Sequence, residues 1–207
     1  MSATKEKILT SARKLFNQHG YAQVTIRMIA QDLGMSSGNL NYHFRKKEDI
    51  LGTLYTQMVE VFDARVEALP ETVFSFPQIR EDIRSSMERM LAYRFFWTDL
   101  HHVLRQHEAI RTHFQGALKR RKAGFLYLIQ QLQGMDLMEA PAYPQEYSLL
   151  ADRMIDYSDT WLYLSQVHPQ AQQNLDQQAN ALLAFFYPFL TQKGKAALQK
   201  AAPDLFT

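Results

Sequence analysis

The stretch TIRMIAQDLGMSSGNLNYHF, residues 25–44, holds two short apolar patterns on either side of a glycine. The apolar spacing predicts a first helix that Thr25 caps and Gly34 ends. Ser36 can cap a second short helix, which Leu40 anchors to the core. Two short helices that cross at a tight turn form a helix-turn-helix.

The second of these helices carries small and polar residues on the face opposite its apolar anchors. Asn side chains can donate and accept hydrogen bonds at adenine edges, and a Ser hydroxyl can do either. A glycine lets the helix approach DNA closely, although Gly38 can also be read as a weak point near a helix start. The pattern favours DNA reading by Ser37, Gly38, Asn39, Asn41, Tyr42 and His43.

Helical periodicity extends outward from this motif through nearly the whole chain, without a convincing strand or a repeat. One helix ends at Gly20, another runs from near Lys47 to before Pro70, and PETVFSFP, residues 70–77, reads as a linker. We predict an all-α fold with two domains, a three-helix DNA-binding domain at 1–46 and a larger helical ligand-binding and dimerisation domain at 47–207. Further helices are expected at 78–98, 100–106, 108–134, 145–167, 170–190 and 193–201.

Composition indicates a globular protein that stays in the cytoplasm. The chain has 207 residues, 46% of them hydrophobic, and no cysteine that could staple a secreted fold. Its start, MSATKEKILTSARKLF, lacks the apolar stretch of a secretory signal. The longest nearly unbroken apolar run, 181–190, is too short to cross a bilayer, so we expect no contact with a membrane.

Charge is distributed unevenly along the chain. Residues 1–50 hold eight Lys or Arg and four Asp or Glu, whereas the other 157 residues hold 15 and 17. A small basic part on a near-neutral body suits a nucleic-acid-binding region on a protein-interaction body, although chance clustering on a solvated face remains the plainer alternative.

Several motifs of the first 51 residues resemble the N-terminal domain of the tetracycline-repressor (TetR/AcrR) family. They are ILTSARKLFNQHGY, TIRMIAQDLGMSSGNL and YHFRKKEDIL, within residues 8–51. The resemblance implies that three N-terminal helices bind double-stranded operator DNA. It further implies a larger helical domain that dimerises and holds a small-molecule inducer, in a repressor released by that molecule.

The resemblance also implies roles for individual residues. Ser36, as the cap, belongs to the candidate DNA-binding set, and Asn41 replaces the tyrosine usual in the family, so the operator sequence does not carry over. His43 has a structural alternative, a hydrogen bond between the third and fourth helices. Thr25 and Arg27 would lie beside the DNA backbone, Ser37, Gly38, Asn39 and Asn41 would face bases, and Tyr42, His43 and Lys47 would hold phosphates.

Aromatic residues gather in YRFFWTDLHH, residues 93–102, as in the lining of an inducer pocket. Aromatic side chains at helical spacing are also ordinary core, and that alternative stays open. The histidines nearby lack the spacing of metal ligands, so we expect no metal and no cofactor, and KRRK, residues 119–122, reads as a solvated helix face. The candidate ligand-binding residues are Tyr93, Phe96, Trp97, His101, Phe125 and Trp161.

Two other classes of function compete with a DNA-binding regulator. An enzyme is disfavoured, because the chain has no nucleophile elbow, phosphate loop or zinc-protease motif. A structural adaptor does not explain why Asn and Ser crowd a short helix after a tight turn.

A regulator of this type needs two reading heads on a palindromic operator. We expect a homodimer through the two C-terminal helices, around 145–190. The alternative is that their apolar stripes face the core of the same chain. The candidate stripes are Tyr147, Leu150, Met154, Trp161 and Ser165, and Leu175, Ala179, Leu182, Leu183, Phe186 and Leu190.

Overall fold

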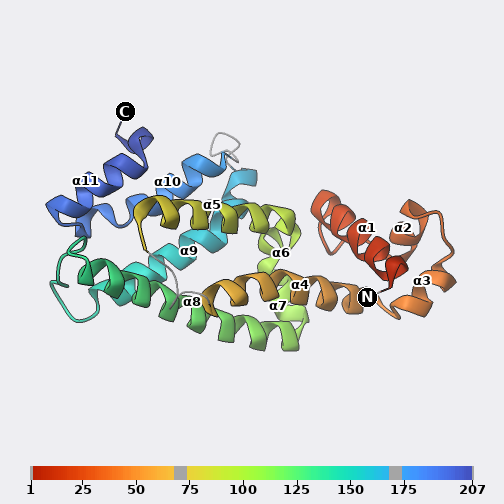
Figure 1. Ribbon diagram of the computed structural model, residues 1–207. Coiled ribbons are helices and arrows are strands. Elements are labelled where there is room, and N and C mark those ends of the chain that lie inside the picture. Colours follow the sequence, from red (N-terminus) through yellow and green to blue (C-terminus); the bar gives the residue numbers. More distant parts are fainter. Residues whose placement is uncertain (1, 68–73, 168–173, 207) are drawn as a thin grey trace. The chain divides into compact units, whose positions relative to one another are not determined.

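The computed structural model describes residues 2–67, 74–167 and 174–206, and these residues form helices joined by short turns (Figure 1). No strand occurs in the described ranges beyond an isolated bridge between Met138 and Leu190. The chain divides into two compact units, Met1–Asp63 with Ala92–His113 (unit 1) and Ala64–Leu91 with Phe114–Thr207 (unit 2). The predicted all-α fold is confirmed, while the domain boundary at residue 46 stays a prediction.

Unit 1 contains the predicted helix-turn-helix. Ile8, Phe16, Ile29 and Leu40 are fully buried and form the core between its first three helices. Unit 1 comprises α1 (Ala3–His19), α2 (Ile26–Asp32), α3 (Ser37–His43), the first part of α4 (Lys47–Glu67), α6 (Arg94–Thr98), α7 (Leu100–Gln106) and the start of α8 (Glu108–Gly134).

Caps and turns set the ends of α2 and α3. The Thr25 hydroxyl accepts a hydrogen bond from the Met28 amide at 3.3 Å, and the Ser36 hydroxyl accepts one from the Asn39 amide at 3.1 Å. Gly34 lies between the helices with φ +63°, a conformation that favours glycine because a Cβ atom is strained there.

The helix expected at 78–98 is interrupted, and this expectation was wrong in its length. α5 (Phe76–Ala92) ends and α6 begins at Arg94, because α1 takes the backbone groups at the break. The Asn17 amide donates to the Ala92 carbonyl at 3.0 Å, and its oxygen accepts from the Phe95 amide at 3.1 Å. A side chain distant in sequence therefore divides one predicted helix into two.

Unit 2 is a helical body with its own apolar core. The helix expected at 170–190 ends at Ala184, and a 3₁₀ turn at Tyr187–Phe189 contains Pro188, which cannot continue an α-helix. Residues 70–73 of the expected linker and 170–173 of this helix lie outside the described ranges, whereas Phe76 and Pro77 open α5. Unit 2 comprises most of α5, the rest of α8, α9 (Glu146–Val167), α10 (Leu175–Ala184), α11 (Gln192–Ala201) and a 3₁₀ turn at Pro203–Leu205.

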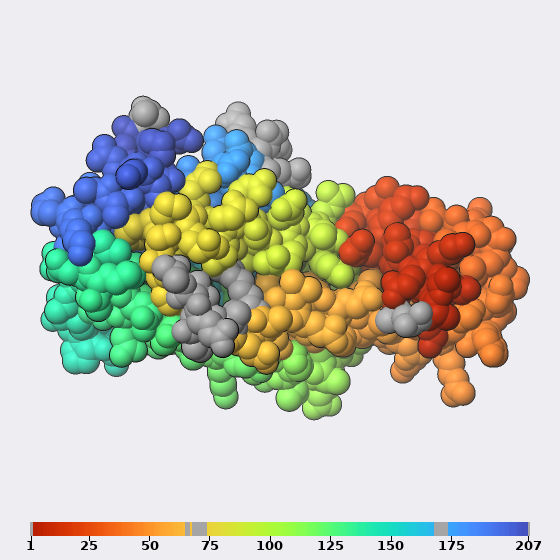
Figure 2. Space-filling model, viewed as in Figure 1, coloured from red at the N-terminus to blue at the C-terminus, as the bar shows by residue number. Residues whose placement is uncertain are grey.

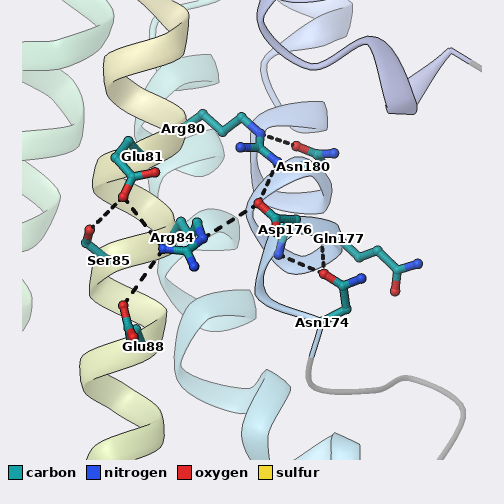
Figure 3. A network of polar contacts seen from close by, with 9 residues as sticks. All are labelled: Arg80, Glu81, Arg84, Ser85, Glu88, Asn174, Asp176, Gln177 and Asn180. Carbon is teal, nitrogen blue, oxygen red and sulfur yellow. Dashed lines mark hydrogen bonds and ion pairs between the residues drawn. The ribbon is translucent and has the colours of Figure 1, made fainter.

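Ion pairs join the helices of unit 2. Arg80 on α5 donates to the Asn180 side chain at 2.7 Å and to Asp176 at 2.8 Å, both on α10 (Figure 3). In the basic run 119–122, Arg121 lies 2.7 Å from Asp159 and Lys122 lies 2.7 Å from Asp152, both on α9. The expectation of a solvated basic face was wrong for these two side chains, because α9 supplies a carboxylate to each.

The two apolar stripes proposed as a dimer seam lie in the core of the chain. Trp161 is 3% exposed, and Leu183 and Phe186 are fully buried. The stripes are therefore covered within one chain, as the alternative stated above has it, and the expectation that they meet a second copy was wrong. The buried members are Tyr147, Leu150, Met154, Trp161, Ala179, Leu182, Leu183, Phe186 and Leu190.

Candidate nucleic-acid interface

α3 exposes most of its length. Leu40 is its one buried residue among 37–43, and Phe44 at its end is 7% exposed. The atoms of α2 and α3 form part of the molecular surface in Figure 2, where the bar gives them in orange. Gly38, Asn39, Asn41 and Tyr42 are exposed, Tyr42 by 85%, while Ser37 and His43 are half-buried.

Gly38 has no packing reason within the chain. A Cβ atom built at this position would meet only the Ser36 hydroxyl, at 3.9 Å, which is ordinary van der Waals contact. Gly38 also lacks the positive φ that Gly34 has. The missing side chain therefore leaves room for something outside the chain to approach the α3 backbone.

The two capping residues keep part of their hydrogen-bonding capacity. Thr25 and Ser36 are exposed, and each hydroxyl accepts one bond from a backbone amide of its helix. A hydroxyl that accepts in this way still has a proton to donate. Each can therefore cap its helix and donate to an acceptor in the solvent, and Arg27, on the first turn of α2, is exposed beside them.

Tyr42 and His43 pack against each other at the end of α3. Their ring centroids lie 5.3 Å apart with the planes nearly perpendicular, at 82°. No hydrogen bond from His43 to α4 occurs among the described residues, so the structural alternative for this histidine has no support. The ring contact restrains both side chains at the exposed edge of α3.

Lys47 differs from the other candidates because its ammonium has partners inside unit 1. Its Nζ donates to the Tyr21 carbonyl at 2.9 Å and lies 4.3 Å from the centroid of the Tyr21 ring. Burial lowers the pKa of Lys47, and the nearby Glu48 carboxylate opposes this shift. Its contact with phosphate stays a prediction.

α2 is tied to α1 through Asp32. The Ser11 hydroxyl donates to Asp32 at 2.7 Å, and Lys14 forms an ion pair with it at 3.0 Å. The hydrogen bonds from Ser11 and Lys14 hold the pKa of Asp32 below its ordinary value. These contacts brace α2, and through the short turn also α3, on α1.

The candidate ligand-binding residues fall in both compact units. In unit 1, Phe96 and Trp97 are buried with ring centroids 5.4 Å apart, and His101 is exposed. In unit 2, Phe125 is half-buried and Trp161 is 3% exposed. Tyr93, in unit 1, is half-buried, with the Arg13 guanidinium 5.1 Å from its ring centroid. A common pocket for these six residues stays a prediction.

Sequence reasoning missed two residues that organise unit 1, Tyr21 and Asp99. Asp99 accepts a hydrogen bond from the Tyr21 amide at 2.9 Å. The available signal was an aromatic residue directly after Gly20, which ends α1 with φ +79°. Such a residue leaves the helix and is free to pack on other elements.

Two searches of the described ranges found nothing. None of the helices there is both apolar enough and long enough for a membrane span. No group of three His, Asp or Glu side chains suited to a metal ion occurs there either.

Known proteins are similar to this chain along its whole length. A family described as "Bacterial regulatory proteins, tetR family" matches residues 8–54, and one described as "Bacterial transcriptional repressor" matches residues 55–198. The HTH-type transcriptional regulator RutR of Escherichia coli (strain K12) is 32% identical over 88 residues, which are 42% of this chain and 42% of that protein. The chain thus spans about two fifths of the length of this curated relative.

Solved structures share the fold. A TetR-family transcriptional regulator from Marinobacter aquaeolei VT8 superposes with a TM-score of 0.88 at 23% identity, over 99% of this chain and 98% of that one. A putative transcriptional regulator from Saccharomonospora viridis, solved in complex with choline, gives a TM-score of 0.71 at 20% identity, over 93% and 100%. With the helix-turn-helix in place and both family matches covering residues 8–198, the chain belongs to the tetR family of bacterial transcriptional regulators.

Proposed function

We propose that this chain is a transcriptional repressor of the cytoplasm, without enzymatic activity, that binds a palindromic operator as a dimer and leaves it when a small molecule binds. The exposed polar face of α3 carries the proposal. It is held by one buried residue, Leu40, and has a glycine that the chain itself does not need. The proposed DNA contacts are Thr25, Arg27, Ser36, Ser37, Gly38, Asn39, Asn41, Tyr42 and His43.

Selection from a pool of randomised DNA duplexes tests the proposal. We expect the full chain to enrich a palindrome with two half-sites, because two α3 helices related by a two-fold axis read the same bases twice. Binding to the selected site should exceed binding to unrelated duplex by at least about 10³-fold at physiological salt. A pool without an enriched sequence after repeated rounds would contradict the proposal.

Residues 1–46 are proposed as the DNA-binding domain and residues 47–207 as the part that binds ligand and dimerises. The solved relative with choline supports a ligand for this fold. Trp161 adds an observation from this chain, since its indole Nε1 is buried without a hydrogen-bond partner among the described residues. A ligand with an acceptor on an apolar body would satisfy such a donor.

A thermal-shift screen coupled to DNA release tests the ligand proposal. Compounds that raise the melting temperature and also release the selected duplex are the candidates. Trp97→Ala and Trp161→Phe should each weaken them, the first by loss of apolar contact and the second by loss of the indole donor. Unchanged affinity in both variants would place the ligand elsewhere.

The dimer proposal keeps the two C-terminal helices but moves the seam to another face of α9. Leu149, Tyr163, Leu164 and Val167 are exposed by 39 to 56%, which is unusual for large apolar residues on one helix. Sedimentation at micromolar concentration tests this face. Leu164→Arg with Val167→Arg should give a folded monomer, Gln166→Arg should leave a dimer, and a double variant that stays dimeric would contradict the proposal.

A further inference from the structure

The ammonium of Lys47 is turned toward the turn between α1 and α2. It donates to the Tyr21 carbonyl at 2.9 Å and also reaches the Ala22 carbonyl at 3.5 Å. The Tyr21 ring lies beneath the same charge, with 4.3 Å between Nζ and the ring centroid. Of three ammonium protons, at least one is engaged by this turn, and the charge rests on an aromatic face.

Tyr21 is held from several sides. Its side chain is 3% exposed, and its ring packs edge-on against Phe16 of α1 at 5.2 Å and His107 after α7 at 5.6 Å. Its amide donates to Asp99 at 2.9 Å. Tyr21 therefore connects α1, α4, α6 and α7 within unit 1, and Lys47 supplies the contact with α4.

The position of Tyr21 bears directly on α2 and α3. The turn that contains it leads to Val24, which is fully buried, and to Thr25, the cap of α2. Because α3 follows α2 after a turn of a few residues, a shift of Tyr21 changes where α3 presents its exposed face.

We propose that Lys47 is a positioning residue for operator binding, which acts through Tyr21 and not through a DNA phosphate. This inference rests on the proposed function and replaces the phosphate contact expected from the family resemblance. A phosphate ligand and a positioning residue differ in a measurable way. Loss of a phosphate contact lowers the salt dependence of binding by about one unit of slope, whereas loss of positioning weakens binding without that change.

Lys47→Met removes the charge and keeps the length of the side chain. Lys46→Met is the matched control because Lys46 is the exposed neighbour, and Arg27→Ala serves as the slope reference for a proposed phosphate contact. The duplex is the palindrome that the wild-type chain selects. We expect Lys47→Met to bind at least about tenfold more weakly, with a slope of log K against log [salt] closer to that of the wild type than to that of Arg27→Ala.

The DNA-free chain gives a second readout. Lys47→Met should lower the melting temperature by about 2 to 4 °C, as expected for the loss of roughly 1 kcal/mol in a chain of this size, and Lys46→Met should not. A slope closer to that of Arg27→Ala, or an affinity equal to that of the wild type, would overturn the proposal. A wild-type chain that selects no duplex would instead refute the proposed function.

Amine labelling of the wild type covers the case in which Lys47→Met does not fold. Reductive methylation with readout by mass should modify Lys47 more slowly than Lys46 in the DNA-free chain, and the selected duplex should not slow Lys47 further. Labelling of Lys47 at the rate of Lys46, followed by protection on DNA, would overturn the proposal.

Discussion

α3 and α10 begin alike and are used differently. Each is a short helix whose start is capped by a side chain, Ser36 for α3 and Asn174 for α10. α3 buries a single residue, whereas α10 buries Ala179, Asn180, Leu182 and Leu183. A cap therefore starts a helix of either kind, and burial decides whether it supports the core or presents a surface.

The polar residues of the two helices show the same difference. Asp176 and Asn180 of α10 bind Arg80 of α5, so these polar groups hold two helices together (Figure 3). Asn39 and Asn41 of α3 are exposed, and neither side chain has a hydrogen bond within the described ranges. Polar side chains that the fold does not use are available to a partner.

The largest expected effect comes from a charge placed in the buried face of α10. Leu183→Arg should destabilise the chain by more than about 4 kcal/mol, because an unpaired charge would replace a fully buried side chain. Denaturation followed by circular dichroism measures this, with Gln177→Arg on the exposed face as control. A stable, folded Leu183→Arg chain would show that this stripe is a surface after all.

A smaller effect is expected from the polar contact between α10 and α5. Asn180→Ala should cost about 1 to 3 kcal/mol, because the Arg80 Nε–H loses its acceptor in a partly buried place. The urea midpoint measures the loss, and Gln177→Ala is the exposed control. Equal midpoints for both variants would mean that water replaces the lost acceptor.

α3 should respond in the opposite way. Asn39→Ala should change stability by less than about 0.5 kcal/mol, since its side chain is exposed, yet alter base preference at one operator position by about 1 to 3 kcal/mol. Binding to single-base variants of the selected duplex measures this, with Gln18→Ala on the exposed face of α1 as control. A uniform loss over all duplexes would assign Asn39 to the DNA backbone.

The smallest expected effect is on the acid side of the stability curve. The pKa of Asp32 is lowered in the folded chain, so its contribution is present above the ordinary value of 3.8 and is lost as the pH falls through the lowered folded pKa. Asp32→Asn should therefore flatten the loss of stability below about pH 5. Melting temperatures from pH 7 to pH 3 test this, and parallel curves for both chains would contradict it.

Much of residues 25–44 could be predicted from the sequence because the signals there are local. The caps Thr25 and Ser36 and the glycine at residue 34 act on backbone groups within one turn of their own positions. The exposed face of α3 followed from the same spacing, with Leu40 as its anchor. The roles of the individual DNA-binding candidates stay predictions.

The sequence by itself determined that the chain is helical, where most helices begin and end, and that α3 carries polar residues opposite an apolar anchor. The tertiary structure alone decided that Asn17 divides α5 from α6, that the stripes of α9 and α10 are covered within the chain, and that Lys47 turns to Tyr21. The physical reason is distance along the chain. Caps and periodicity depend on neighbours within a few residues, whereas the partner of a buried stripe or a long cation lies on another helix, and folding brings the two together.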